Sequence, residues 1–156
     1  MAVTGFKSLL GIQVQTGTVV IPQTVASPGT TYFTIAGGIV LVTGMLGVIT
    51  TAIGGAVSPQ WQMNPTTGTA SVLCTTGLAI TAFVAGDILT LDGALGDAML
   101  PTAHAGCAPM FSAAGEGIML PSGNLSVITA ASQTGNWYWI LWYLPVTPGA
   151  TVVNAL

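Results

Sequence analysis

The chain has 156 residues, of which 51% are apolar and only 3% are charged, and its formal net charge is -3. Because Lys7 is the only Lys or Arg residue, binding to nucleic acid, to phosphate-rich cofactors or to anionic lipid is not expected. The length fits one domain, and so few charges indicate a surface that partner subunits largely cover.

The first residues lack a basic region followed by a continuous apolar run, so we expect no signal peptide and folding in a reducing cytoplasm. In that compartment disulfides are uncommon. Two free, buried thiols at Cys74 and Cys107 are therefore favoured over a bridge between them, which stays open as the alternative.

The segment Ile35–Val57 is uncharged and long enough to span a bilayer. However, neither end has a Lys or Arg residue to set its orientation. The segment is rich in Val, Ile and Thr and is interrupted by several glycines, which favours short paired strands joined by turns. A membrane span is the lesser alternative, and we expect no membrane partner.

Turn sequences recur at short intervals along the rest of the chain, for example SPGT at Ser27–Thr30 and NPTTG at Asn64–Gly68. Runs of β-branched and aromatic residues lie between the turns and predict strands. The predicted strands are Gly17–Ile21, Thr31–Ile35, Ile39–Thr43, Val48–Ile53, Ala70–Leu73, Ile88–Leu91 and Leu125–Ala130. We therefore predict an all-β fold over residues 1–156, either an antiparallel β-sandwich or a jelly-roll-like barrel.

The clearest element is the uninterrupted apolar run WYWILWYL at Trp137–Leu144. In a strand, alternate side chains of this run point to opposite faces, so both faces must be covered. One face fits the core of the domain, and the other fits a second sheet, a neighbouring subunit or a carbohydrate-binding shelf. The predicted interface residues are Trp137, Tyr138, Trp139, Ile140, Leu141, Trp142, Tyr143, Leu144, Pro145 and Val146.

Two connections are also predicted around this run. The Gly-containing loop at 132–136 is typical of a hairpin between Leu125–Ala130 and Trp137–Leu144. Pro145 and Pro148 are expected to end the strand ladder, so residues 145–156 would leave as a C-terminal arm. Residues 1–16 are a possible N-terminal arm.

The few ionisable residues offer little chemistry. Asp87, Asp92 and Asp97 each adjoin a glycine and suit turn positions, with a Ca²⁺ site as the lesser alternative. His104 and Glu116 are not part of any metalloprotease or nucleophile motif. We therefore expect no enzymatic activity, no cofactor and no resident metal.

Several segments taken in order resemble a family of small virion structural proteins of tailed bacteriophages. They are GTVVIP at Gly17–Pro22, the segment Thr30–Gly55, NPTTGTASVLC at Asn64–Cys74, Leu78–Ile80 followed by GDIL at Gly86–Leu89, and Thr134–Val153. The closing segment of that family follows a pattern that Trp139, Leu141, Tyr143, Pro145, Gly149 and Ala150 match here. The chain departs from the family in having apolar residues where the first strands and final hairpin usually carry Arg, Glu and Lys.

The resemblance implies a capsid decoration, cement or minor head protein on the surface of a virion, made in the host cytoplasm. It implies a homotrimer or another symmetric oligomer, with the major capsid protein as the second partner. A tail or fibre component that binds a receptor or glycan is the alternative with the same composition.

Overall fold

The computed structural model describes residues 30–56, 58–74, 80, 83–90, 117–129 and 134–155, together with the backbone of 13–15 and 100–101. Every regular element in these ranges is a β-strand. The strands are β1 Gln13–Gln15, β2 Thr30–Ala36, β3 Val40–Thr51, β4 Gln60–Pro65, β5 Ser71–Val72, β6 Ile88–Thr90, β7 Leu100–Pro101, β8 Ile118–Leu120, β9 Gly123–Ile128, β10 Asn136–Pro145 and β11 Thr151–Asn154.

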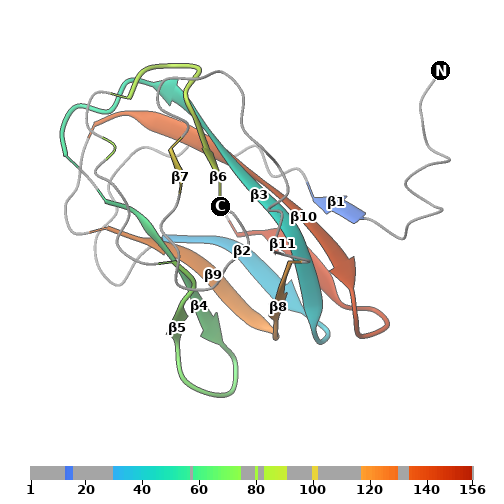
Figure 1. Cartoon of the computed structure of the whole chain (residues 1–156). Coiled ribbons are helices and arrows are strands. Elements are labelled where there is room, and N and C mark those ends of the chain that lie inside the picture. The colour runs from blue at the N-terminus through green and yellow to red at the C-terminus, as the bar shows by residue number, and fades with distance from the viewer. Residues whose placement is uncertain are drawn as a thin grey trace, which may run out of the picture.

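The strands form two antiparallel sheets that face one another (Figure 1). Sheet A has the order β1-β10-β3-β6-β7, with β8 also paired to β3, and sheet B has the order β11-β2-β9-β4-β5. The predicted all-β antiparallel fold is confirmed, in its sandwich form. Within the described ranges, no helix is long and apolar enough to cross a membrane, and the segment Ile35–Val57 contains the end of β2 and all of β3.

The core lies between the sheets and is built from alternate residues of each strand, as the two-residue period requires. In β10 the side chains of Trp137, Trp139, Leu141 and Tyr143 are at most 1% exposed. Strand β2 carries two buried residues in succession, Tyr32 and Phe33, because its register with β9 shifts there. Such a β-bulge turns an extra side chain toward the core.

The segment Ile35–Val57 differs in detail from the prediction. It was expected to hold short paired strands, but β3 runs unbroken for 12 residues, and β2 and β3 belong to different sheets. Gly44 and Gly47 lie inside β3 rather than in turns. Gly47 faces Trp139, and a Cβ atom there would lie 2.7 Å from the indole ring, so this glycine makes room for a side chain.

Two predicted connections are wrong. Strands β9 and β10 do not form a hairpin, since β9 pairs with β2 and β4 in sheet B while β10 pairs with β1 and β3 in sheet A. Residues 145–156 do not leave as an arm, because the chain turns after Pro145 and β11 pairs with β2 over Thr151–Asn154. Of residues 1–16, the described part is β1, which pairs with β10.

Candidate assembly surface

Strand β10 presents its second set of side chains to the outside of sheet A. Tyr138, Ile140, Trp142 and Leu144 are half-buried, and they alternate with the four residues that enter the core. The described strands form only two layers, so none of them covers this side of sheet A. The burial pattern thus divides the predicted interface residues into a core set and an outward set.

Strand β3 extends the same surface. The register places Val48 beside Tyr138, Leu46 beside Ile140 and Leu41 beside Leu144, and directly paired residues share one face of a sheet. Met119 of β8 pairs with Leu41, and Ile88 of β6 pairs with Val48. We define the outer apolar face as Leu41, Leu46, Val48, Ile88, Met119, Tyr138, Ile140, Trp142 and Leu144.

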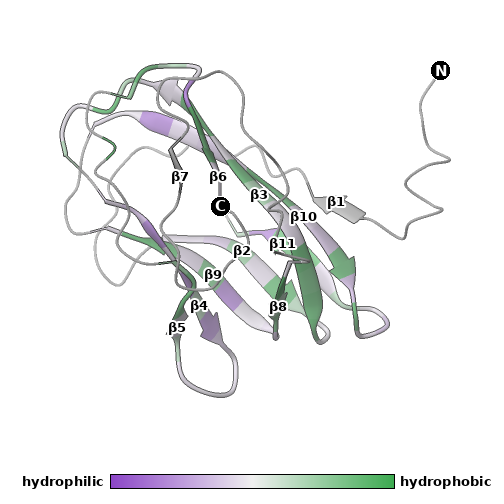
Figure 2. Ribbon diagram, viewed as in Figure 1, coloured by the Kyte–Doolittle hydropathy of each residue, from purple (hydrophilic) through white to green (hydrophobic). Residues whose placement is uncertain are grey.

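The residues of the outer apolar face differ in exposure and in side-chain size. Met119 is 68% exposed, whereas Thr90, which pairs with Leu46 at the β6 border, is buried. Trp142 pairs with Gly44, so the largest side chain of the face adjoins a position that has none. Figure 2 shows the apolar character of β3 and of the C-terminal end of β10.

Charge is almost absent from the part of the chain that the structure describes. Its single charged side chain is Asp87, which is only 3% exposed. The Asp87 carboxylate accepts a hydrogen bond from the Val84 backbone N–H at 2.8 Å, and backbone bonds to Ile49 join this turn to β3. The turn interpretation is confirmed for Asp87, whereas Asp92, Asp97, His104 and Glu116 lie outside the described residues.

In the described ranges we find neither a candidate metal site nor a reactive thiol. The described ranges contain no group of three or more His, Cys, Asp or Glu residues that could hold a metal ion. Cys74 is free and buried, its Sγ accepts a hydrogen bond from the Trp61 backbone N–H at 3.1 Å, and burial raises the pKa of its thiol. Such a thiol stays protonated and is a poor nucleophile. Cys107 lies outside the described residues.

A second apolar surface lies at one end of the sandwich, at the bottom of Figure 1, where the β2–β3 and β10–β11 turns meet. Ile39 and Val146 are 42% and 51% exposed there. The backbone N–H of Val146 donates to the Ile39 carbonyl at 3.0 Å, and the Ile39 N–H donates to Oγ1 of Thr147 at 3.0 Å. These bonds hold both exposed side chains on a fixed backbone. We call Ile39 and Val146 the apolar tip.

A cavity of about 330 Å³ opens near the apolar tip, between the β4–β5 hairpin and β8. Its walls are mainly apolar and include Met63, Leu73, Ile118 and Leu120, with Thr67, Thr69 and Ser71 at the hairpin. No charged side chain is among the residues that line it. The cavity is therefore suited to an apolar group rather than to an ionic substrate.

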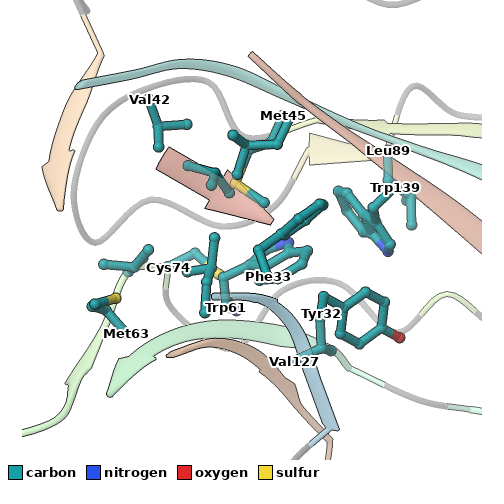
Figure 3. Close-up of a cluster of buried hydrophobic side chains, with 14 of the residues drawn as sticks. Tyr32, Phe33, Val42, Met45, Trp61, Met63, Cys74, Leu89, Val127 and Trp139 are labelled. Carbon is teal, nitrogen blue, oxygen red and sulfur yellow. Dashed lines mark hydrogen bonds between the residues drawn. The ribbon is translucent and has the colours of Figure 1, made fainter. Parts of the chain in front are cut away.

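An aromatic cluster lies in the core between the two sheets (Figure 3). Trp61 packs edge-to-face against Tyr32 at 5.3 Å and against Trp139 at 5.0 Å, measured between ring centroids. Nε1 of Trp137 donates to the Tyr32 hydroxyl at 2.7 Å. The buried Nε1 atoms of Trp61 and Trp139 have no hydrogen-bond partner. The cluster is thus a packing centre rather than a polar network.

Sequence reasoning identified only part of this surface. It placed Tyr138, Ile140, Trp142 and Leu144 on one face of a strand, and the burial pattern confirms that alternation. It missed Leu41, Leu46 and Val48, because the glycines of β3 were interpreted as turns. The signal was present, since Leu46 and Val48 alternate with buried neighbours.

Comparison of the chain with known protein families, with curated proteins and with solved structures returns no match. The fold and the outer apolar face therefore stand on their own geometry.

Proposed function

We propose that this chain is a structural virion protein of a tailed phage, a capsid decoration, cement or minor capsid protein on the surface of the shell. It stabilises the shell through apolar contacts with copies of itself and with the major capsid protein. Support comes from the ordered sequence resemblance and from the lack of exposed charge in the described ranges.

The observation that carries the proposal is the outer apolar face. Its side chains are half-buried except for Met119, which is 68% exposed, and a contiguous apolar patch at a protein surface is a mark of an interaction site. Here two adjacent strands, β10 and β3, present Trp, Tyr, Leu, Ile and Val side chains outward on the same side. Burying such area contributes about 25 cal/mol per Å² before the costs of association are subtracted.

The proposal is tested by locating the protein on particles. Purified virions carrying a labelled copy of this chain are imaged by electron microscopy, and we expect label distributed over the head. In a binding assay to particles that lack the protein, Trp142→Ala should lower occupancy several-fold while its circular dichroism spectrum stays that of the parent. The control is Val153→Ala, an exposed valine on β11 of the other sheet.

Two results would contradict this assignment. Label confined to the tail, together with binding to a glycan array, would favour the tail or fibre alternative. Label absent from purified particles would remove the virion role altogether.

A further inference from the structure

The cavity of about 330 Å³ between the β4–β5 hairpin and β8 is a feature that the proposed function does not use. We infer that it binds a small uncharged amphiphile, a molecule with an apolar body and a hydroxyl, ester or amide group at one end. The inference goes beyond the virion role and does not depend on it, because it rests only on the walls of this cavity.

Backbone contacts hold the two sides of the cavity in place. The Thr66 N–H of the hairpin donates to the Ser122 carbonyl, beyond the end of β8, at 2.9 Å. Oγ of Ser122 in turn accepts a hydrogen bond from the Gly38 N–H at 3.0 Å. Gly123 lies so close to the hairpin that a Cβ atom there would collide with the Asn64 carbonyl. The cavity therefore lies within a fixed backbone frame, as ligand pockets usually do.

The volume of the cavity sets the size of the ligand. A cavity of about 150 Å³ with apolar walls holds one benzene molecule. This cavity has about twice that volume and falls within the range of about 300–1,000 Å³ for ligand pockets. Met63 of β4 and Met119 of β8 line it, and their flexible thioether side chains adapt to apolar ligands of different shape. We therefore expect an apolar body larger than a single aromatic ring.

The polar side chains of the cavity lie on its hairpin side. Thr67, Thr69 and Ser71 bring hydroxyl groups there, and a hydroxyl both donates and accepts hydrogen bonds. The β8 side, residues 118–121, has only apolar side chains. None of the described residues that line the cavity is charged, so an ionised ligand group would lose its hydration without gaining a charged partner. The ligand is therefore uncharged, with its polar end beside the hairpin.

The test is a titration of the full chain with phenylbutanol, followed by NMR of isotope-labelled methionine methyl groups. We expect saturable shifts of the Met63 and Met119 signals, with a dissociation constant of about 1 mM. The Met45 signal is the internal control, because Met45 is buried in the core and does not line the cavity, and it should not shift. Phenylbutyrate has a similar apolar body but ends in a carboxylate, so it should bind at least tenfold more weakly.

Two substitutions in β5 test the location of the site. Ser71 lines the cavity, so Ser71→Trp should fill it and weaken phenylbutanol binding at least tenfold. Val72→Trp is the matched control, because successive side chains of a strand point to opposite faces. Val72 is 46% exposed and does not line the cavity, so this variant should keep the affinity of the parent.

Nuclear Overhauser contacts cover the case in which Ser71→Trp fails to fold. In the parent chain they should join the ring protons of phenylbutanol to the methyl groups of Met63 and Met119. The inference is overturned by the absence of a saturable shift or of these contacts, by equal binding of phenylbutyrate, or by a folded Ser71→Trp variant that binds like the parent.

These measurements can fail independently of the proposed function. A chain that decorates particles but does not bind phenylbutanol would remove the ligand site and keep the virion role. A chain that binds phenylbutanol in the cavity but is absent from particles would keep the ligand site and remove the virion role.

Discussion

At the scale of single residues, a buried side-chain hydrogen bond joins the two sheets across the core. Nε1 of Trp137 on β10 donates to the Tyr32 hydroxyl on β2, and both residues are fully buried. The β-bulge at Tyr32 turns that hydroxyl inward. Since Trp61 and Trp139 already bury their Nε1 atoms without a partner, the bond to Tyr32 protects the core from a third such group.

Tyr32→Phe should therefore leave the Trp137 Nε1–H buried and without its partner. We expect the free energy of unfolding at pH 7 to fall by about 1–3 kcal/mol, measured by urea titration. Burial raises the pKa of Tyr32 far above its ordinary value of 10.0, although the Trp137 bond lowers it by a smaller amount. Above pH 10, Tyr32 ionises in the unfolded parent chain but not in the native one, so the free energy of unfolding of the parent falls. The difference in free energy of unfolding between the parent and Tyr32→Phe therefore becomes smaller.

The matched control for this change is Tyr138→Phe. Tyr138 is half-buried on the outer apolar face, so the same loss of a hydroxyl should change the free energy of unfolding by less than about 0.5 kcal/mol. Equal effects of the two substitutions would show that the buried bond has no special role.

At the scale of elements, strands could be predicted where composition and alternation agreed. The predicted strand boundaries were wrong where a glycine makes room for a neighbouring side chain instead of forming a turn. The alternation in β10 follows directly from an apolar run that has to bury both faces. Strand β3 was divided in two because Gly44 and Gly47 have the composition of turns. Their actual role depends on Trp139 and Trp142, which are nearly a hundred residues away, and no local pattern contains that information.

Strand β11 shows the same limit at the C-terminal end. Strand β10 ends at Pro145, as expected, but the turn that follows, which contains Pro148, returns the chain to the sandwich instead of releasing it. Ala150 and Val152 are 1% and 0% exposed, while Val153 is 44% exposed. The short TVV run could have been recognised as a strand, but its partner, β2, is more than a hundred residues earlier.

A pair of neighbouring substitutions tests this placement of β11. Val152→Ala should lower the free energy of unfolding by about 2 kcal/mol, because about two buried carbon groups and their contacts are lost. Val153→Ala should change it by less than about 0.5 kcal/mol. Urea unfolding of both variants measures the difference. Equal small effects would contradict the pairing of β11 with β2 and would favour a free C-terminal arm at residues 145–156.

At the scale of the whole molecule, the sandwich class was predictable and the strand order was not. Regular turns and β-rich runs indicate antiparallel sheets, but they do not say which strands pair. The connection between β9 and β10 crosses from sheet B to sheet A, although its Gly-containing sequence is equally compatible with a hairpin. The outer apolar face needs β10 beside β3, so it follows from the topology and not from either segment alone.

The scarcity of charge predicts how the whole molecule responds to salt. Exposed ion pairs weaken as salt shortens the Debye length from about 30 Å at 0.01 M to about 3 Å at 1 M. The described ranges contribute no exposed charged side chain, so contacts made by the outer apolar face contain no ion pair from these ranges that salt could weaken. We expect the binding of the parent chain to particles that lack it to change less than about twofold between about 0.05 and 0.5 M NaCl, measured by co-sedimentation with the particles. Val153→Lys should behave in the same way, since its added charge lies on the other sheet. A fall of tenfold or more in the parent would mean that charged groups outside the described ranges make the contact, in place of the β3 and β10 side chains.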